Sequence, residues 1–328
     1  MKKILVAMAL VASLARLNAQ ACCCTSAGGS YSILPNIDEH IIGMRYTHSN
    51  WSSTTYPVMN MNMDGMNMSM MGNGIPTIEN MNTIDLFGRF VLPKRFYISA
   101  FLPVHILHES YTGSNTRAMG LGDVSMLLQY ALFDPKKCNG HPSKHQLRFG
   151  VGLKAPTGKF NMTPDGMYTT DLQLGTGSWD VMFNAIYTFR YKQFGFNASA
   201  SYKKNTANTD KFRFGDKTGG ALEAFYIVKL PGSLSFMPKM GAHYEYAFRN
   251  YNAGEKLTYT GGQNLYADAG FDIYYKNLAF SMSISPTLYN VYNWIGEPFE
   301  HYSIETGVYY SFSKIINHKK HTSNEKQL

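Results

Sequence analysis

The chain has 328 residues, of which 14% are aromatic and 16% are charged, and its formal net charge is +8. Lys and Arg are scattered and form no recognised nucleic-acid module, so the positive charge does not predict nucleic-acid binding. After the first twenty residues no stretch is long and apolar enough for a membrane-spanning helix, and one domain is the default at this length.

The chain begins with the pattern of a secretory signal peptide, which we place at residues 1–21. A basic start and an apolar run over residues 4–14 precede small residues, so that cleavage could follow Ala19 or Ala21. We therefore expect an exported protein in which residues 22–38 form a periplasmic N-terminal segment.

Three adjacent cysteines, Cys22, Cys23 and Cys24, follow the predicted cleavage point. If cleavage follows Ala21, Cys22 could be lipidated, although the preceding residues form a poor lipobox. Exported thiols are usually oxidised, so one interpretation is a disulfide to Cys138 in a predicted periplasmic turn. Thiolate binding of a soft metal is the other interpretation.

A methionine-rich stretch over residues 57–73 alternates methionine with small polar residues on both sides of Asp64-Gly65. Asp-Gly favours a two-residue hairpin turn, which would bring six methionines onto one face. The expected pairs are Met63 with Met66, Met61 with Met68, and Met59 with Met70. Thioether sulfur is a soft, uncharged ligand that suits Cu(I), so we expect a metal site here. The alternative is a flexible loop that packs or contacts a partner.

The remainder of the chain predicts strands in which apolar and polar residues alternate with a period of two. The clearest run is 146–204, where a tight link at 191–193 joins two strands into a hairpin. One parity carries aromatic and aliphatic residues and the other carries charge, Gly, Ser and Asn, which favours a membrane barrel over a soluble sandwich. We expect an all-β antiparallel barrel of about twelve strands. The strands are 39–49, 83–92, 95–107, 122–130, 146–155, 179–190, 194–204, 218–229, 234–246, 264–275, 278–289 and 300–312.

The links between these strands alternate in length. Tight links lie near residues 93, 192, 231 and 276, and long links lie near 65, 113, 163, 210, 255 and 295. In bacterial outer-membrane barrels short turns face the periplasm and long loops face outside. We therefore predict an outer-membrane barrel over residues 39–313, both termini in the periplasm, the methionine-rich loop outside, and a polar periplasmic tail over residues 314–328.

The polar parity of the strands predicts the side chains that line the lumen. They are Arg148, Lys154, Asp180, Asn184, Arg190, Lys203, Lys239, His243, Glu245, Asp268, Asp272 and Glu305. Charges of both signs could line a water-filled pathway or could pair with one another in a closed barrel. No Ser and His spacing indicates a catalytic site, so we expect no enzyme.

Three glycine-rich motifs carry a resemblance to a known family. They are Gly120-Leu121-Gly122-Asp123-Val124, Gly150-Val151-Gly152-Leu153-Lys154-Ala155-Pro156-Thr157-Gly158 and Leu174-Gly175-Thr176-Gly177-Ser178-Trp179-Asp180. Through them, residues 80–313 resemble the outer-membrane β-barrel family named for the MetA (meta) pathway of phenol degradation. The resemblance implies a barrel with a transport role and identifies no substrate. The methionine-rich loop and the cysteines are not part of the family pattern.

These features predict an outer-membrane channel surrounded by lipid, whose solute could be a soft metal ion such as copper or its complexes. The resemblance implies the alternative, a channel for small hydrophobic or aromatic solutes. A third hypothesis is a non-conducting surface barrel whose methionine-rich loop binds a partner. The oligomeric state stays open.

Overall fold

The structure is a computed structural model. It describes residues 39–55, 58–63, 66–71, 75–111, 114–133, 143–160, 173–258, 260–292 and 299–312. The predicted signal peptide, the four cysteines, the Asp64-Gly65 turn and the predicted tail lie outside the described residues. For most of the methionine-rich loop only the backbone is described.

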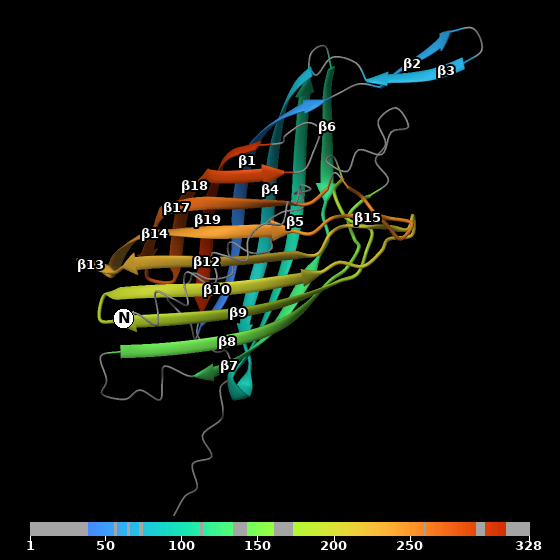
Figure 1. Cartoon of the computed structure of the whole chain (residues 1–328). Helices are drawn as coiled ribbons and strands as arrows, with labels where there is room; N and C mark the ends of the chain where they lie inside the picture. Colours follow the sequence, from blue (N-terminus) through green and yellow to red (C-terminus); the bar gives the residue numbers. More distant parts are fainter. Residues whose placement is uncertain are drawn as a thin grey trace, which may run out of the picture.

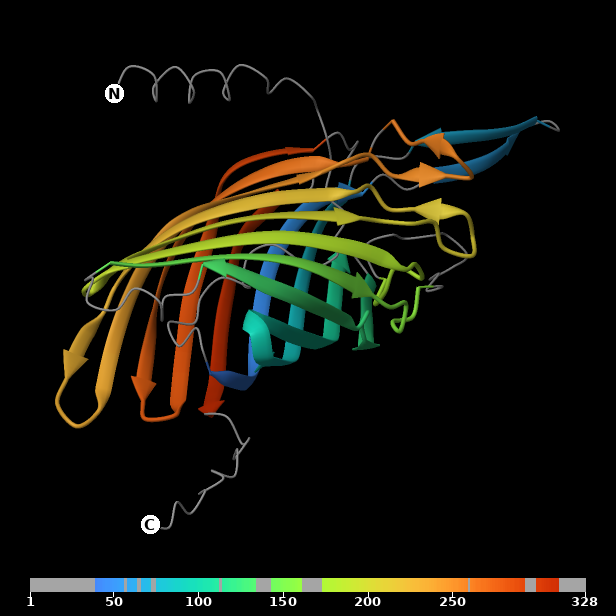
Figure 2. The same cartoon turned by 90° about the horizontal axis from the view of Figure 1, so that it is seen from below.

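The molecule is a closed antiparallel barrel of 12 strands (Figure 1, Figure 2). The strands are β1 (His40–Thr55), β4 (Ile75–Val91), β5 (Phe96–Tyr111), β7 (Ser125–Phe133), β8 (Ser143–Lys154), β9 (Asp180–Tyr191), β10 (Phe194–Lys204), β12 (Lys217–Tyr226), β14 (Leu234–Ala247), β17 (Gly262–Tyr275), β18 (Leu278–Tyr292) and β19 (Phe299–Phe312). Each pairs with the next, and β1 pairs with β19 to close the barrel. The predicted fold is confirmed, and every predicted strand has a counterpart.

Two short strands belong to the same sheet. β6 (Ser114–Leu121) pairs with one half of β5, and β7 pairs with the other half, so the chain breaks between them at residues 122–124. β13 (Val228–Leu230) continues β12 along β14. Each is therefore the continuation of a neighbouring strand.

The β5–β6 region differs from the prediction. The link near residue 113 was expected to be long, yet β5 and β6 are joined by a two-residue link, so that prediction was wrong. The strand expected at 122–130 begins only at Ser125. The polar residues at 114–117 continue the ladder, because a strand that extends beyond the apolar band need not alternate with hydrophobic residues. For the same reason β1 and β4 are longer than expected.

The two faces of the barrel wall differ in composition. Outward side chains are apolar and between 36% and 54% exposed on β8, β9 and β10, for example Leu153, Phe183 and Tyr202. Residues of the opposite parity, such as Gln146 and Ile186, are buried inside. A closed barrel with an apolar outer surface is the structure of an outer-membrane β-barrel.

The two ends of the barrel also differ. The turn end carries the tight links at 192–193, 231–233 and 276–277, and the helical turn η1 (Pro93–Arg95). The loop end carries β11 (Phe212–Arg213), β15 (Tyr251–Asn252) and β16 (Glu255–Lys256), which form a small sheet of their own. Strands of two residues have no periodicity to detect, so these three were not predicted. Within the described part of the chain, no helix is long and apolar enough to cross a membrane.

The methionine-rich loop forms the hairpin of β2 (Val58–Met63) and β3 (Met66–Met71), which projects beyond the loop end (Figure 1, Figure 2). Its backbone register pairs Met59 with Met70, Met61 with Met68 and Met63 with Met66, as predicted. The hairpin pairs only with itself among the described strands.

Candidate functional site

On each strand, the predicted lumen residues occupy the alternate positions that face inward. Five are buried: Arg148, Lys154, Asp180, Lys203 and Asp272. The others are partly buried: Asn184, Arg190, Lys239, His243, Glu245, Asp268 and Glu305. Most of them belong to one of two groups. The first, which we call the clamp, lies near the loop end around Lys154. The second is a set of ion pairs across β1, β4, β14, β17 and β19.

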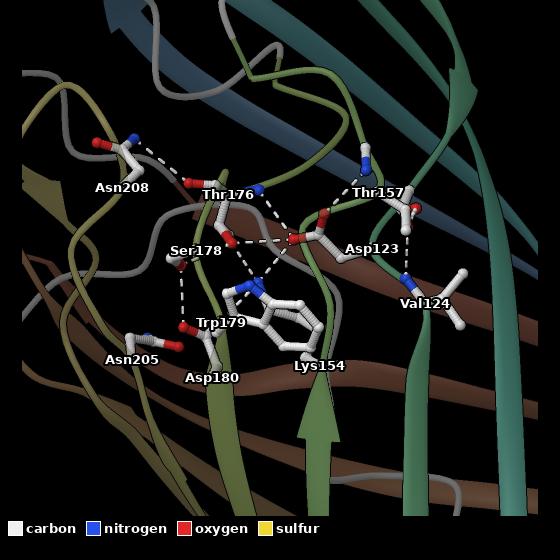
Figure 3. Close-up of polar contacts among 12 residues, drawn as sticks. Asp123, Val124, Lys154, Thr157, Thr176, Ser178, Trp179, Asp180, Asn205 and Asn208 are labelled. Carbon is white, nitrogen blue, oxygen red and sulfur yellow. Dashed lines mark hydrogen bonds and ion pairs between the residues drawn. The ribbon is translucent and has the colours of Figure 1, made fainter.

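Lys154, at the end of β8, is the centre of the clamp (Figure 3). Its Nζ lies 2.6 Å from Asp123 Oδ2 and 2.6 Å from Asp180 Oδ2, and it also donates to Thr176 Oγ1. Asp123 precedes β7 and Asp180 begins β9, so three neighbouring strands meet at one ammonium. The three side chains are at most 10% exposed, and buried charges are tolerated only when they are paired in this way.

Residues 173–179 form a segment that we call the inner strap, and the clamp holds it in place. The N–H and the hydroxyl of Thr176 each donate to Asp123 Oδ2 at 2.9 Å. The Ser178 hydroxyl donates to Asp180 Oδ1 at 2.9 Å (Figure 3). Asp123 and Asp180 therefore each hold the strap by charge-assisted hydrogen bonds, which are stronger than neutral ones.

An apolar contact shows where the inner strap lies. Leu174 packs with Leu107 of β5 and Ala118 of β6, and all three are at most 3% exposed. Leu107 has the same parity as Tyr97 and Ser99, which are buried on the inner side of β5. The strap therefore covers the inner surface of β5 and β6 and occupies part of the lumen near the loop end.

The three glycine-rich motifs meet at the clamp. The Thr157 hydroxyl donates to the Gly122 carbonyl at 2.8 Å and accepts from the Val124 N–H at 2.9 Å. The Gly158 N–H donates to Asp123 Oδ1 at 3.0 Å. Contacts between the motifs therefore hold residues 122–124 in place, where the chain breaks between β6 and β7.

Glycine is required at position 175 because Asp123 and Gly158 lie very close to its Cα atom. A Cβ there would lie 2.5 Å from Asp123 Oδ1 and 2.7 Å from the Gly158 carbonyl oxygen. Any side chain would push the strap away from the clamp, because neither neighbour can move without breaking its hydrogen bonds.

The clamp is linked to the loop 205–216. The Thr206 N–H donates to Asp180 Oδ1 at 3.1 Å, and the Asn208 amide donates to the Thr176 carbonyl at 3.3 Å. Farther along this loop, Asp216 accepts hydrogen bonds from Tyr202 and Lys204, both at 2.8 Å. The loop end is thus a connected polar network.

Asp216 also accepts the Asn205 N–H at 3.0 Å. Burial raises the pKa of the Asp216 carboxyl, but the hydrogen bonds from Lys204, Tyr202 and Asn205 outweigh burial and hold the pKa below its ordinary value. The carboxylate is therefore the form that the folded loop selects.

Ion pairs cross the inner wall between neighbouring strands. Arg45 Nη2 lies 2.8 Å from Asp85 Oδ2, and its Nε lies 3.7 Å from Glu305. On the other side, Lys239 Nζ lies 3.0 Å from Asp272 Oδ1. Each of these charges therefore has a partner of opposite sign on a neighbouring strand.

His243 belongs to the same wall. Its Nδ1 lies 2.9 Å from Asp268, and its ring stacks on Tyr266 at 4.3 Å. Ser285 donates to Asp268 at 2.6 Å, so these three side chains do not have the arrangement of a nucleophile and its base. Among the described residues, no group of three or more His, Cys, Asp and Glu side chains could hold a metal ion.

Aromatic residues also face inward, and the alternation argument missed them. The Phe87 ring lies 6.2 Å from Phe101 and 5.4 Å from Tyr309, with the Arg45 guanidinium 5.9 Å from its centre. A Cβ on Gly43 would lie 2.8 Å from Tyr309 and 2.9 Å from Phe87. Glycine on the inner parity, opposite an aromatic residue, is a signal that could have found this cluster.

A second apolar cluster lies toward the turn end. Phe225, Ile227 and Met237 are buried together, and Tyr274 packs against them. A Cβ on Gly195 would lie 2.0 Å from the Phe225 ring, so glycine again makes room for an inward aromatic. The inner surface is therefore a mixture of paired charges and packed rings.

Comparison with known proteins identifies the family. Residues 82–288, more than half of the chain, match the model of the family described as "Putative MetA-pathway of phenol degradation". The chain belongs to this family. The matched residues include the clamp, the inner strap and the Lys239–Asp272 ion pair, and they exclude the methionine-rich hairpin, Arg45 and Glu305. No curated protein matches the chain.

Several solved structures are similar to this family member. A COG4313 outer membrane channel from Pseudomonas putida F1 has 18% identity and a TM-score of 0.61, over 88% of this chain and 100% of that chain. The β domain of the Bordetella autotransporter BrkA has 13% identity over 83% of this chain and 100% of that chain, with a TM-score of 0.43. A FadL homologue from Pseudomonas aeruginosa has 10% identity over 90% and 97%, with a TM-score of 0.37. The first similarity shows the fold, and the other two carry no argument.

Proposed function

We propose that this protein is an outer-membrane channel for small hydrophobic, phenol-like aromatic solutes. The observation that carries the proposal is the ring cluster of Phe87, Phe101 and Tyr309 on the inner wall. The lumen of a general porin is polar and water-filled, and rings of this kind are not needed there. An aromatic solute gains apolar contact and favourable ring geometry from such a wall.

The polar groups next to the rings complete the proposal. Arg45, Asp85 and Glu305 lie beside the cluster and retain 13%, 15% and 21% side-chain exposure. A few polar groups in a mostly apolar pathway orient a solute and bind its hydroxyl. This wall therefore suits a molecule with one ring and one hydrogen-bonding group.

The comparisons support the same solute class. The family description refers to phenol degradation, and the similar barrel from Pseudomonas putida is an outer membrane channel. Neither description mentions a metal. A small aromatic solute therefore replaces copper as the proposed cargo of the lumen.

Uptake of labelled phenol tests the proposal. We would express the protein in a two-membrane host that lacks its general porins and compare the initial rate of uptake with that of the empty host. Faster uptake is expected with the protein present. Equal rates in the two strains would contradict the proposal.

A pair of variants ties the effect to the inner wall. Phe87→Leu removes an inward ring and should slow uptake about two- to tenfold, because one aromatic pair contributes about 0.5–1.5 kcal/mol. Phe183→Leu removes an outward ring that is 48% exposed, and uptake should not change. The same loss in both variants would show that the rings act on barrel stability and not on the solute.

A further inference from the structure

The methionine-rich hairpin is a motif that the proposed channel does not use. It lies beyond the loop end, outside the residues that match the family, and it pairs with no strand of the barrel among those described (Figure 1). Its strands nevertheless have a complete register from Val58↔Met71 to Met63↔Met66. Its pairing is therefore set by its own two strands.

At every second position of the register, a methionine of β2 lies opposite a methionine of β3. These pairs are Met59↔Met70, Met61↔Met68 and Met63↔Met66. The intervening pairs are Asn60↔Ser69 and Asn62↔Asn67. Methionine is thus paired with methionine, and each small polar residue with another small polar residue.

The backbone pairing keeps neighbouring methionine positions close together. Residues directly opposite in an antiparallel ladder have Cα atoms about 4.5–5.5 Å apart, and the next pair on the same face lies about 6.8 Å along the strand. Methionine has three rotatable side-chain bonds and adapts to irregular spaces. Two adjacent pairs therefore place four methionines at neighbouring positions of the register.

We propose that the β2–β3 hairpin is a binding site for a soft monovalent metal ion, Cu(I) or its analogue Ag(I). Thioether sulfur favours soft ions, while hard divalent ions favour oxygen and nitrogen ligands. The residues between the methionines are uncharged Asn and Ser, which add no carboxylate to attract a divalent ion. A thioether has no proton to lose, so the site holds its ion in mildly acidic medium, where thiolate and imidazole sites weaken.

Titration of the full-length protein in detergent with silver nitrate tests this site. The parent for all variants has Cys22, Cys23, Cys24 and Cys138 replaced by Ser, because thiolates also bind Ag(I). By calorimetry at pH 7 and pH 5 we expect binding at both values and no comparable binding of Zn(II). Zn(II) bound as tightly as Ag(I), or Ag(I) binding lost at pH 5, would overturn the proposal.

Two variants separate the site from methionine content. Replacing all six paired methionines by Leu should abolish Ag(I) binding. The exchange Met66→Asn, Asn67→Met, Met68→Ser, Ser69→Met keeps the number of methionines but moves two of them to the other parity. It should weaken binding about tenfold, since each adjacent set of four loses ligands.

Each of these two variants has an outcome that would contradict the proposed site. Retained binding in the six-Leu variant would place the ion elsewhere, and unchanged affinity after the exchange would show that composition matters and the paired register does not. Met119→Leu with Met240→Leu is the matched control, because both side chains are more than 60% exposed on the barrel wall, outside the hairpin. The electrophoretic shift of the folded barrel on heating confirms that each variant is folded. Phenol uptake is a separate measurement, so the metal site and the channel can fail independently.

Discussion

Lys154 is the residue at which three strands and the inner strap converge. Lys154→Met would leave Asp123 and Asp180 buried without their shared cation. Removing one partner of a buried ion pair costs about 3–5 kcal/mol. We expect this loss in denaturant unfolding of the purified barrel in detergent.

Lys204→Met is the control for that experiment. Lys204 also pairs with a carboxylate, Asp216, but its side chain is 48% exposed. Exposed pairs contribute about 0–1 kcal/mol, so this variant should unfold almost as the parent does. Equal destabilisation of the two variants would show that the clamp is not the stronger contact.

The Asp216 carboxyl gives the loop end a dependence on pH. Its pKa is lower in the folded loop than in the unfolded chain, so the unfolded chain binds the proton more readily. The stabilisation is therefore complete above the ordinary Asp pKa of about 4 and is lost as the pH falls through the lowered value. Hydrogen exchange of the Asn205 amide, which donates to the Asp216 carboxylate, should show this loss.

Asp216→Asn is the matched variant for the pH series. At pH 6 its loop should exchange faster than that of the parent, because the amide accepts weaker hydrogen bonds from Lys204 than the carboxylate does. Once the pH falls below the lowered pKa of Asp216, the two proteins should become alike. A difference that persists undiminished at low pH would assign the effect to another group.

At the scale of the element, β9 shows how the wall separates lipid from lumen. Phe183 faces outward at 48% exposure and stacks on Tyr202 of the neighbouring strand at 6.5 Å. Phe183→Arg would place a charge against lipid and should cost about 2–4 kcal/mol near the midplane. Phe183→Leu keeps the site apolar and should cost much less. Folding of both variants into lipid vesicles, measured by the electrophoretic shift, compares them, and equal folded fractions would contradict the assigned face.

The strands were predictable to different degrees. β10 was expected at 194–204 and lies at Phe194–Lys204, because its alternation runs from end to end. β6 was taken for a polar loop, since Ser114–Leu121 offers Asn, Thr and Arg where a wall strand would carry apolar residues. Hydrogen bonding to β5 holds it as a strand, and a partner strand is not visible in the local sequence.

At the scale of the whole molecule, the two ends predict its orientation. Gly232 lies in a turn-end link, and Gly254 lies between β15 and β16 at the loop end. Both have positive φ, and neither has an atom within 4 Å of an added Cβ, so an inserted tag should not disturb the barrel. A tag at Gly254 should bind antibody on intact cells, and one at Gly232 only after the outer membrane is opened. The opposite pattern would reverse the orientation, and labelling of both on intact cells would contradict a barrel that spans the membrane.

The sequence alone determined the barrel, its twelve strands and the pairing of the methionine hairpin. Each of these depends on periodicity or on a short link between near neighbours, such as the alternation around Phe183 or the link between Met63 and Met66. Only the tertiary structure decided that Asp123, Lys154, Thr176 and Asp180 form one clamp, and that Phe87, Phe101 and Tyr309 meet inside the lumen. The reason is that closing the barrel sets β1 beside β19 and folds the strap against β5 and β6, and such contacts between distant segments follow from chain geometry rather than from any local pattern.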